Sequence, residues 1–459
     1  MGTLYFILSL SILVLLHEFG HFLAARSFGT RVEKFYLFFD FLFPIPTLLN
    51  FALFKKKIGD TEYGIGWFPL GGYVKIAGMM DESMDEDAMK LPPQPDEYRS
   101  KKNWQKLIIM LGGIIMNILL GWLIYSQLLF WKGDVYMAAD GVKNGIHCDS
   151  VAIKAGFRDG DMILSHDGGK QFESWFTIPK ELILDDIKTV EVKRVDGTKE
   201  TITLPADFIA TAVAARGHGL FEFRIPCLVG KIAKENVIEG KLKKGDVIVK
   251  INDSTINYFT DAPPVLATLK EKQANITFVR GADTMHTSVI VPKTGLIGFG
   301  PAMASKDLHL YQGYLNFSEV QYGLFGSFKA GAVKAYKSMR DYLKQFKLIF
   351  SPTVKGYKQL GGVGTMASMF PDDMTLEGFL SLTAFISLIL AVANLLPIPM
   401  LDGGYVIMLL IEMIIRRPLN EKVVENIQKV GLIFILALMV FANGNDLYRW
   451  IMTRFFHGA

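Results

Sequence analysis

An HExxH motif lies inside a long apolar stretch at the start of the chain. Between Leu4 and Ala25 the only formally charged residue is Glu18, which stands between the motif's histidines, His17 and His21. Residues four apart share a helix face, so both imidazoles can reach one Zn²⁺ while the glutamate faces its open coordination position. Ionisable groups are costly within a membrane and mark functional sites there. The pattern predicts a zinc-dependent hydrolytic site on a membrane-spanning helix.

Two other interpretations of this segment are weaker. The histidines could be satisfied by neighbouring groups, but an apolar span would then bury three polar side chains without a purpose. A signal peptide needs a basic start and a small-residue cleavage site. Met1-Gly2-Thr3 is not basic, and no such cleavage site follows a short apolar core.

Length and composition predict a polytopic α-helical membrane protein. The chain has 459 residues, of which 50% are hydrophobic, a high share for a soluble protein of this size. Crossing a bilayer takes about 20 apolar residues. Four transmembrane helices are expected, within 1–28, 107–130, 379–404 and 430–452. The fourth is the weakest, because only Val430–Ala442 is continuously apolar before the polar run 443–446.

Basic residues near the span ends predict the orientation. Such residues precede the second span and follow the third, and they belong on the cytoplasmic side: Arg99, Lys101, Lys102, Lys106, Arg416 and Arg417. The 29–106 loop and the 405–429 segment are then cytoplasmic, and residues 131–378 lie outside. Arg449 and Arg454 in the outer tail run against this rule. The net charge of +4 is too small to indicate a nucleic-acid partner.

The outer segment contains an internal repeat. The stretch Ala155–Leu164 is echoed 85 residues later by Gly240–Val249, each with a Gly-Asp turn leading into a β-prone run. The pattern resembles PDZ domains, which bind peptides by adding a strand to a sheet edge. The two copies could instead be spacers that exclude bulky substrates sterically. Two PDZ-like β-rich domains are expected, over 131–215 and 216–305. Cys148 and Cys227 fall in different repeats and are expected to be unpaired buried thiols.

A glycine-punctuated β-prone stretch, Gly64–Lys75, lies in the loop between the first two spans. It is too short to cross a membrane and predicts a membrane-associated β-hairpin. Such a hairpin, with Gly71, Gly72 and Tyr73, would offer an unpaired strand edge to an unwound substrate. An interfacial loop packed under the helices is the alternative.

The third zinc ligand is expected after the third span. A catalytic zinc has three protein ligands and leaves one position for water. Pro397 and Pro399 end the third helix, and Asp402 follows, before Gly403-Gly404. Asp402 could instead cap a helix that starts at Tyr405. Its pairing with an intramembrane HExxH favours the ligand role.

Residues 306–378 are expected to hold an amphipathic helix and a linker outside the membrane. Between Phe317 and Phe350, apolar residues recur at helical spacing and basic residues stand between them. A basic amphipathic helix is typical of an anionic membrane surface. It could instead pack on the PDZ-like pair as a half-buried helix.

Together these features resemble the site-2 protease family, and within it the bacterial regulator of sigma-E protease type. HExxH lies in the first span, an NxxPxPxLDGG pattern at 394–404 follows the third, and the PDZ-like tandem lies between spans two and three. The match runs through nearly the whole chain in order. The resemblance implies a zinc intramembrane metalloprotease of the bacterial inner membrane with a periplasmic PDZ tandem.

The resemblance also implies roles for individual residues. His17, His21 and Asp402 would bind Zn²⁺, Glu18 would be the general base, and Asn394 would lie near the substrate. The implied substrates are single-span anti-sigma factors already trimmed outside the membrane, and remnant signal peptides. A zinc transporter and a catalytically inactive PDZ scaffold are the rival functions. A transporter needs neither the glutamate nor peptide-binding domains, and an inactive scaffold would have no reason to keep every motif residue.

Overall fold

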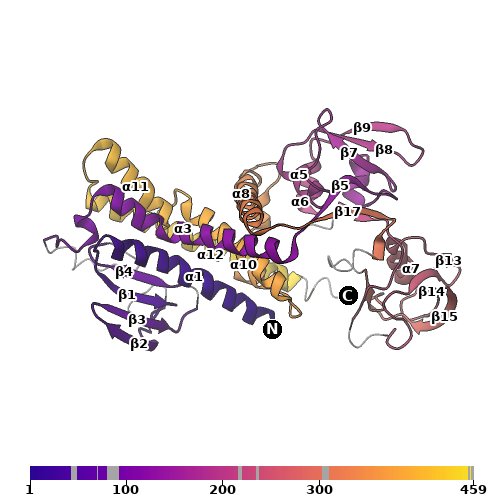
Figure 1. The fold of residues 1–459 in the computed structure, drawn as a ribbon, viewed down its shortest axis with the longest axis horizontal. Helices are drawn as coiled ribbons and strands as arrows, with labels where there is room; N and C mark the ends of the chain where they lie inside the picture. Colours follow the sequence, from indigo (N-terminus) through magenta and orange to yellow (C-terminus); the bar gives the residue numbers. More distant parts are fainter. Residues whose placement is uncertain are drawn as a thin grey trace. The chain divides into compact units, whose positions relative to one another are not determined.

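The computed structural model describes residues 1–42, 49–69, 71–79, 92–215, 220–233, 237–301, 310–452 and 455. The chain divides into two compact units, a helical one and a β-rich one (Figure 1). The helical unit comprises Met1–Gly133, Gln321–Phe350 and Gly356–Ala459. The β-rich unit comprises Asp134–Val320 and Ser351–Lys355.

Four helices of the helical unit have the length and apolar composition needed to cross a membrane. They are α1 (Gly2–Ser27), α3 (Asn103–Lys132), α10 (Leu376–Leu395) and α12 (Glu421–Ile451). Each contains one of the apolar stretches identified in the sequence, so the prediction of four spanning helices is confirmed. Each helix also begins before its apolar stretch, because helical hydrogen bonding continues through the flanking polar residues.

The polar run near the end of α12 does not interrupt the helix. Asp446 accepts hydrogen bonds from the backbone N–H groups of Gly362 (3.0 Å) and Thr365 (2.8 Å), and Asn443 accepts one from Val363 (3.2 Å). The segment that they hold contains η5 (Gly356–Gln359) and α9 (Val363–Ser368). These partners explain why polar side chains are tolerated directly after the apolar stretch of this helix.

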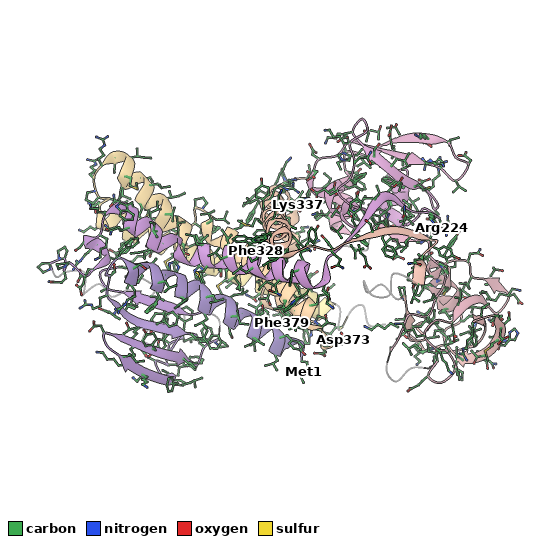
Figure 2. All side chains as sticks on the ribbon, viewed as in Figure 1. Met1, Arg224, Phe328, Lys337, Asp373 and Phe379 are labelled. Carbon is green, nitrogen blue, oxygen red and sulfur yellow. The ribbon has the colours of Figure 1, made fainter. Side chains whose placement is uncertain are left out.

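The predicted basic amphipathic helix is α8 (Leu324–Ile349), which packs on α3 and α10. Its packed face is made of small residues, with Ser327, Gly331 and Ala335 buried. Trp122 donates an indole hydrogen bond to the Phe328 carbonyl (2.8 Å), and Figure 2 labels Phe328 on this helix. The expected start at Phe317 is wrong, because Leu315–Val320 forms strand β17, paired with β5 (Asp134–Val142).

The segment after the third span is helical as well. Helix α11 (Asp402–Ile415) begins at Asp402 itself, with Leu401 as its cap residue, and it packs against α3. The alternative of an aspartate cap for a helix starting at Tyr405 is therefore wrong. The sequence predicted a single segment over 405–429. The structure divides this range between α11 and the start of α12, which are separated by residues 416–420.

A four-stranded sheet follows α1 in the chain. Its strands are β1 (Val32–Leu37), β2 (Ala52–Ile58), β3 (Thr61–Gly66) and β4 (Tyr73–Ile76), in the order β2-β3-β1-β4. The expected hairpin within Gly64–Lys75 is wrong, because β1 lies between β3 and β4 and pairs with both. The hairpin is formed by β2 and β3 instead. Strand β4 is an edge strand, and Leu70 lies outside the described residues.

The β-rich unit has two hydrophobic cores, which divide it into a first and a second half. The elements of the first half, besides β5 and β17, are β6 (Ile146–Cys148), α4 (Ser150–Lys154), β7 (Met162–His166), η2 (Trp175–Thr177), α5 (Ile178–Leu184), β8 (Thr189–Lys193), β9 (Lys199–Thr203), α6 (Phe208–Ala214) and β10 (Phe221–Phe223). Those of the second half are β11 (Lys231–Ile232), β12 (Val247–Ile251), β13 (Ser254–Thr255), η3 (Phe259–Asp261), α7 (Ala262–Thr268), β14 (Gln273–Arg280), β15 (Asp283–Ile290) and β16 (Phe299–Gly300).

Each half has an ion pair between a buried aspartate and an arginine. Asp161 before β7 binds Arg194 (2.6 Å), and Asp246 before β12 binds Arg280 (2.8 Å). The domain boundary expected at 216 is displaced, because β10 pairs with β6 and packs in the first core. Both cysteines are free and buried, as expected.

Candidate metal centre

Helix α1 places His17 and His21 on one buried face. Both side chains are less than a tenth exposed, at 8% and 7%. The rings lie 4.9 Å apart, and their Nε2 atoms are separated by 3.3 Å. The four-residue spacing predicted this shared face, because a helix turns once in 3.6 residues.

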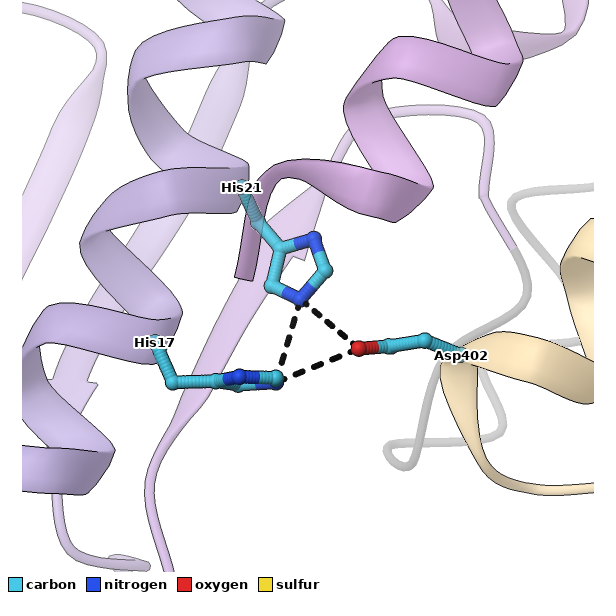
Figure 3. Close-up of side chains that lie close together, drawn as sticks. All are labelled: His17, His21 and Asp402. Atoms are coloured by element: carbon cyan, nitrogen blue, oxygen red, sulfur yellow. Dashed lines mark hydrogen bonds and ion pairs between the residues drawn. The ribbon is translucent and has the colours of Figure 1, made fainter. Parts of the chain in front are cut away.

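The loop between α10 and α11 brings the third candidate ligand to the same point. Asp402 Oδ2 lies 3.2 Å from His17 Nε2 and 3.4 Å from His21 Nε2 (Figure 3). Met400, two residues earlier, has a positive φ of 74°. This left-handed residue turns the chain sharply after Pro399, so that the first residue of α11 points its carboxylate back towards α1.

The three atoms fit a tetrahedral zinc. Zinc binds histidine nitrogen and carboxylate oxygen at about 2.0–2.1 Å, so neighbouring ligand atoms of a tetrahedron stand about 3.3 Å apart. The separations here are 3.2, 3.3 and 3.4 Å. Asp402 Oδ2 is buried and accepts no hydrogen bond among the described residues, which a metal would explain. His21 Nδ1 bonds the Ile109 carbonyl (2.8 Å), which leaves Nε2 free to bind a metal.

A glycine on α3 makes room for the histidines. A Cβ atom on Gly113 would stand 2.5 Å from both His17 Cε1 and His21 Nε2. Next to these residues, Gly20 and Gly112 allow the backbones of α1 and α3 to touch, since a Cβ on Gly20 would meet the Gly112 oxygen at 2.2 Å. The metal centre therefore depends on close packing of α1 on α3.

Asn117 is a site residue that the sequence reasoning missed. Its side chain is fully buried on α3, and its amide nitrogen lies 3.1 Å from His17 Nδ1. Its Oδ1 has no hydrogen-bond partner among the described residues. If the amide is turned over, Oδ1 accepts the Nδ1 proton of His17, which leaves His17 Nε2 for the metal. The signal was present in the sequence as the only hydrogen-bonding amide near the middle of an apolar span.

The remaining predicted residues line one cavity with the metal centre. Its volume is about 420 Å³, and its lining includes Glu18, Asn394, Gly71, Gly72 and Tyr73 together with the two histidines and Asp402. Asn394 reaches from α10, with Nδ2 3.3 Å from His17 Nε2. The structure thus brings all eight candidate residues together.

Edge strand β4 forms one wall of this cavity. Gly72, just before the strand, touches α1 so closely that a Cβ would meet Val14 at 2.9 Å and Glu18 at 3.5 Å. Tyr73 donates its hydroxyl to Asp40 Oδ1 (2.9 Å), a carboxylate that Lys34 also approaches (3.4 Å). This buried network, which sequence reasoning did not find, holds the start of β4 against the cavity.

Helix α12 also supports the site. Gln428 accepts a hydrogen bond from the backbone N–H of Met400 (2.7 Å), the left-handed residue before Asp402. A Cβ on Gly431 would lie 2.4 Å from Pro399 Cβ, so α12 packs directly on the same loop. The position of the third candidate ligand therefore depends on a helix that follows it in the chain.

Comparison with known proteins agrees with this geometry. The chain is 29% identical over 455 residues to a protein of Neisseria meningitidis serogroup A, with 95% of each chain covered. It is 29% identical over 471 residues to one of Vibrio cholerae, covering 97% of this chain and 98% of the other. A Campylobacter jejuni protein is 27% identical over 454 residues, with 97% and 93% covered. All three are provisionally named zinc metalloproteases.

The sequence pattern of one protein family extends through almost the whole chain. The pattern of Peptidase family M50 matches residues 5–438, from the first spanning helix to the middle of the fourth. This range contains both the HExxH helix and the loop that carries Asp402. The chain therefore belongs to peptidase family M50, the site-2 protease family of zinc metalloproteases.

Proposed function

We propose that this protein is an intramembrane zinc protease, which hydrolyses a peptide bond within or near the transmembrane segment of single-span membrane proteins. Its substrates would be a trimmed anti-sigma factor, in an envelope stress response, and remnant signal peptides. The enzyme would be a multi-pass protein of the bacterial inner membrane, with the active site near the cytoplasmic side. The β-rich unit would be a periplasmic pair of PDZ-like domains.

One observation carries the proposal. Three ligand atoms at tetrahedral separations and an adjacent glutamate line a cavity whose other walls are apolar spanning helices and a strand edge. A structural zinc site would have four protein ligands, whereas the candidate ligands here number three among the described residues. An open fourth position beside Glu18 is the arrangement that hydrolysis requires.

The residues supply a complete route for hydrolysis. Zinc, when bound by His17, His21 and Asp402, would supply a Lewis acid and lower the pKa of water at the site. Glu18 would take the proton of the attacking water and pass it to the leaving amine. Asn394 would donate its amide to the substrate carbonyl as negative charge develops there.

Strand β4 would present the substrate. A transmembrane helix hides its carbonyls in i→i−4 hydrogen bonds, so the segment must unwind before attack. Strand β4 ends the sheet, with β1 as its only strand partner among the described residues, so an extended segment could add beside it as a fifth strand. Because Gly72 lies directly against Glu18, a strand at this edge would run past the catalytic groups.

The experiment compares two classes of variant in reconstituted membranes with a single-span substrate. Glu18→Gln should abolish cleavage and leave about one zinc per chain, because the glutamate is not a ligand. His17→Ala should lose both zinc and cleavage. Normal cleavage by Glu18→Gln would refute the proposed mechanism, and a zinc-free wild type that still cleaves would refute the metal assignment.

A further inference from the structure

The outer edge of the four-stranded sheet carries an unusual surface, formed by Phe51–Ile58 and called here the β2 edge. Lys55, Lys56 and Lys57 are consecutive and exposed on β2, whose only strand partner in the described part of the chain is β3. No acidic side chain among the described residues forms an ion pair with them. The apolar residues around them are exposed as well, Leu53 at 68% and Phe54 at 57%. Lysines without ion pairs, clustered with exposed apolar side chains on one strand, indicate a binding partner that has both anionic and apolar groups.

The register of the sheet relates this surface to positions along α1. Gly72, just before β4, lies beside Glu18, whereas Ile76 at the end of β4 pairs with Val32, shortly after the end of α1. Strand β4 therefore runs from the level of the metal centre towards the end of α1.

Strand pairing relates these positions on β4 to positions on β2. Tyr73 is opposite Tyr36, which is opposite Gly64, and Gly64 is opposite Lys55. Lys57 lies further towards the end of α1, opposite Glu62. Phe54, opposite Ile65, lies on the other side of Lys55, nearer the bilayer centre. The strand is thus apolar at the end level with the metal centre and basic towards the end of α1, where exposed Ile58 follows the lysines.

Further exposed apolar side chains lie on β3, beside the apolar end of β2, and on α1. Ile65, paired with Phe54, is itself 40% exposed, and so are Phe19 and Leu23 on α1, at 36% and 43%. Trp67 stacks on Phe51 at 5.7 Å and donates its indole N–H to the Leu49 carbonyl. A tryptophan with a paired N–H beside exposed apolar side chains is typical of a membrane interface.

We propose that the β2 edge binds anionic phospholipid headgroups, with Lys55, Lys56 and Lys57 on the phosphates and Leu53 and Phe54 among the acyl chains. Lysine suits this place because its flexible stem can lie along apolar surface while the ammonium group reaches the headgroups. The leaflet concerned is the one at the Ser27 end of α1. Since β2 and β4 belong to one sheet, this contact would fix the depth of the whole sheet in the bilayer. It would thereby fix the position of β4 relative to the metal centre.

The experiment measures the depth of Leu53 in the full-length protein. A Leu53→Cys variant is labelled with a fluorophore and reconstituted into phosphatidylcholine vesicles with or without phosphatidylglycerol, and quenching by lipids spin-labelled on the acyl chain is recorded. Burial raises the pKa of the Cys148 and Cys227 thiols to about 12, so both stay unlabelled at neutral pH. Phosphatidylglycerol should increase quenching of the Leu53 probe.

Three further variants of the labelled Leu53→Cys protein test whether the lysine charges cause the effect of phosphatidylglycerol. An anionic surface contributes about fivefold in binding for each nearby lysine, so replacing all three by Gln should abolish the effect of phosphatidylglycerol. Replacing all three by Arg should retain it. A matched triple change to Gln at Lys241, Lys243 and Lys244, in the β-rich unit, should also retain it. Zinc content verifies that each variant is folded.

Two results would overturn the proposal. The first is quenching that does not depend on phosphatidylglycerol in the wild type, or that still depends on it after the triple change to Gln. The second is protection of the Leu53 probe by a single-span peptide in neutral vesicles, which would make the β2 edge a polypeptide-binding strand.

Discussion

The chemistry of the metal centre depends on residues that are not themselves ligands. Gly113 leaves the space in which both imidazoles lie, and Asn117 contacts the ring nitrogen of His17 that faces away from Asp402. Groups behind metal ligands commonly set tautomer and orientation, and their loss costs about 10–100-fold in metal affinity. Two predictions at the scale of single residues follow from these contacts.

Changing Asn117 tests the proposed support of His17. Asn117→Asp offers only acceptor oxygens to Nδ1–H, so zinc affinity should stay equal or rise, whereas Asn117→Leu should lower it about 10–100-fold. Affinity is measured by competition with a chelator. Ser387→Ala is the control, because Ser387 donates a hydrogen bond to the backbone oxygen of Asn117 (2.7 Å) and not to its side chain. Equal affinities in the Asp and Leu variants would rule out a role in fixing the tautomer.

Changing Gly113 tests the space around the histidines. Gly113→Ala puts a methyl group 2.5 Å from both imidazoles, so zinc content should fall well below one per chain. Gly121→Ala on the same helix is the matched control, since its methyl group would meet the flexible Leu388 side chain instead, at 2.6 Å. Both changes crowd a helix contact, at a cost of about 1–3 kcal/mol. Zinc loss in both variants alike would mean that general packing of α3, rather than the histidine space, controls the site.

At the scale of elements, α12 is attached mainly through polar contacts near its two ends. Gln428 holds the Met400 loop near one end, and Asp446 holds the segment around Gly362–Thr365 near the other. Between them many of its apolar residues are exposed, as lipid-facing residues are, while Leu436 and Met439 line the cavity. Buried hydrogen bonds to a carboxylate are worth more than those between neutral groups.

Removing the Asp446 carboxylate should free the segment that it holds. Asp446→Ala leaves the N–H groups of Gly362 and Thr365 unpaired, at about 1.5–3 kcal/mol for each bond to the charged group. Hydrogen exchange of these amides should therefore accelerate by tenfold or more. Glu425→Ala on the same helix removes only an exposed pair with Lys429 and should leave the exchange unchanged. Unchanged exchange in Asp446→Ala would show that other contacts hold the segment.

The ion pair before β12 predicts a pH dependence in the β-rich unit. Burial opposes ionisation of Asp246, but hydrogen bonds from Arg280 and from the Lys243 backbone outweigh it, so the pKa of Asp246 is lowered. A carboxyl group whose pKa is lower in the folded state than its unfolded value of about 3.9 stabilises the fold when the pH is above that unfolded value. This stability is lost as pH falls through the folded pKa. The melting temperature of the wild type should therefore decrease when the pH is lowered below about 4.

The control for this pH dependence is Asp246→Asn, which cannot titrate. It should be less stable than the wild type at pH 7, and the difference should shrink as pH falls through the acid range. A difference that stays constant from pH 7 to pH 3 would mean that Asp246 contributes packing but no titrating interaction.

At the scale of the whole molecule, the β-rich unit is an insertion whose two ends meet. Strands β5 and β17 pair antiparallel, with Asp134 opposite Val320. The chain therefore leaves the helical unit after Gly133 and returns at Gln321 through neighbouring positions. Insertions with adjacent ends can be removed without stretching the remaining chain.

Deleting residues 134–320 and joining Gly133 to Gln321 with a short linker tests the role of this unit. The shortened protein should keep its zinc, because every candidate ligand belongs to the helical unit. If the β-rich unit excludes bulky substrates, the deletion should permit cleavage of single-span substrates that still carry a folded outer domain. The measurement compares cleavage rates for outer domains of increasing size. Rates independent of size in the intact enzyme would instead favour recognition of peptide ends.

The sequence by itself determined the features that depend on neighbours in the chain. The spacing of His17 and His21 places both on one helix face, and apolar stretches of sufficient length predict the first three spanning helices, because helix geometry and bilayer thickness act locally. The sequence also pointed to Asp402 through the prolines before it. It could not show that this carboxylate meets the histidines, since that contact joins residues 385 positions apart.

Only the tertiary structure decided which distant groups pair. Strand β1 lies between β3 and β4, because a parallel partner supplied by an earlier segment replaced the hairpin that local sequence favoured. Asn117 and Gly113 became site residues only through the packing of α3 on α1. The polar run of α12 could continue as a helix because a separate segment supplied its hydrogen-bond partners. Each outcome depends on contacts between chain segments far apart, for which local periodicity carries no signal.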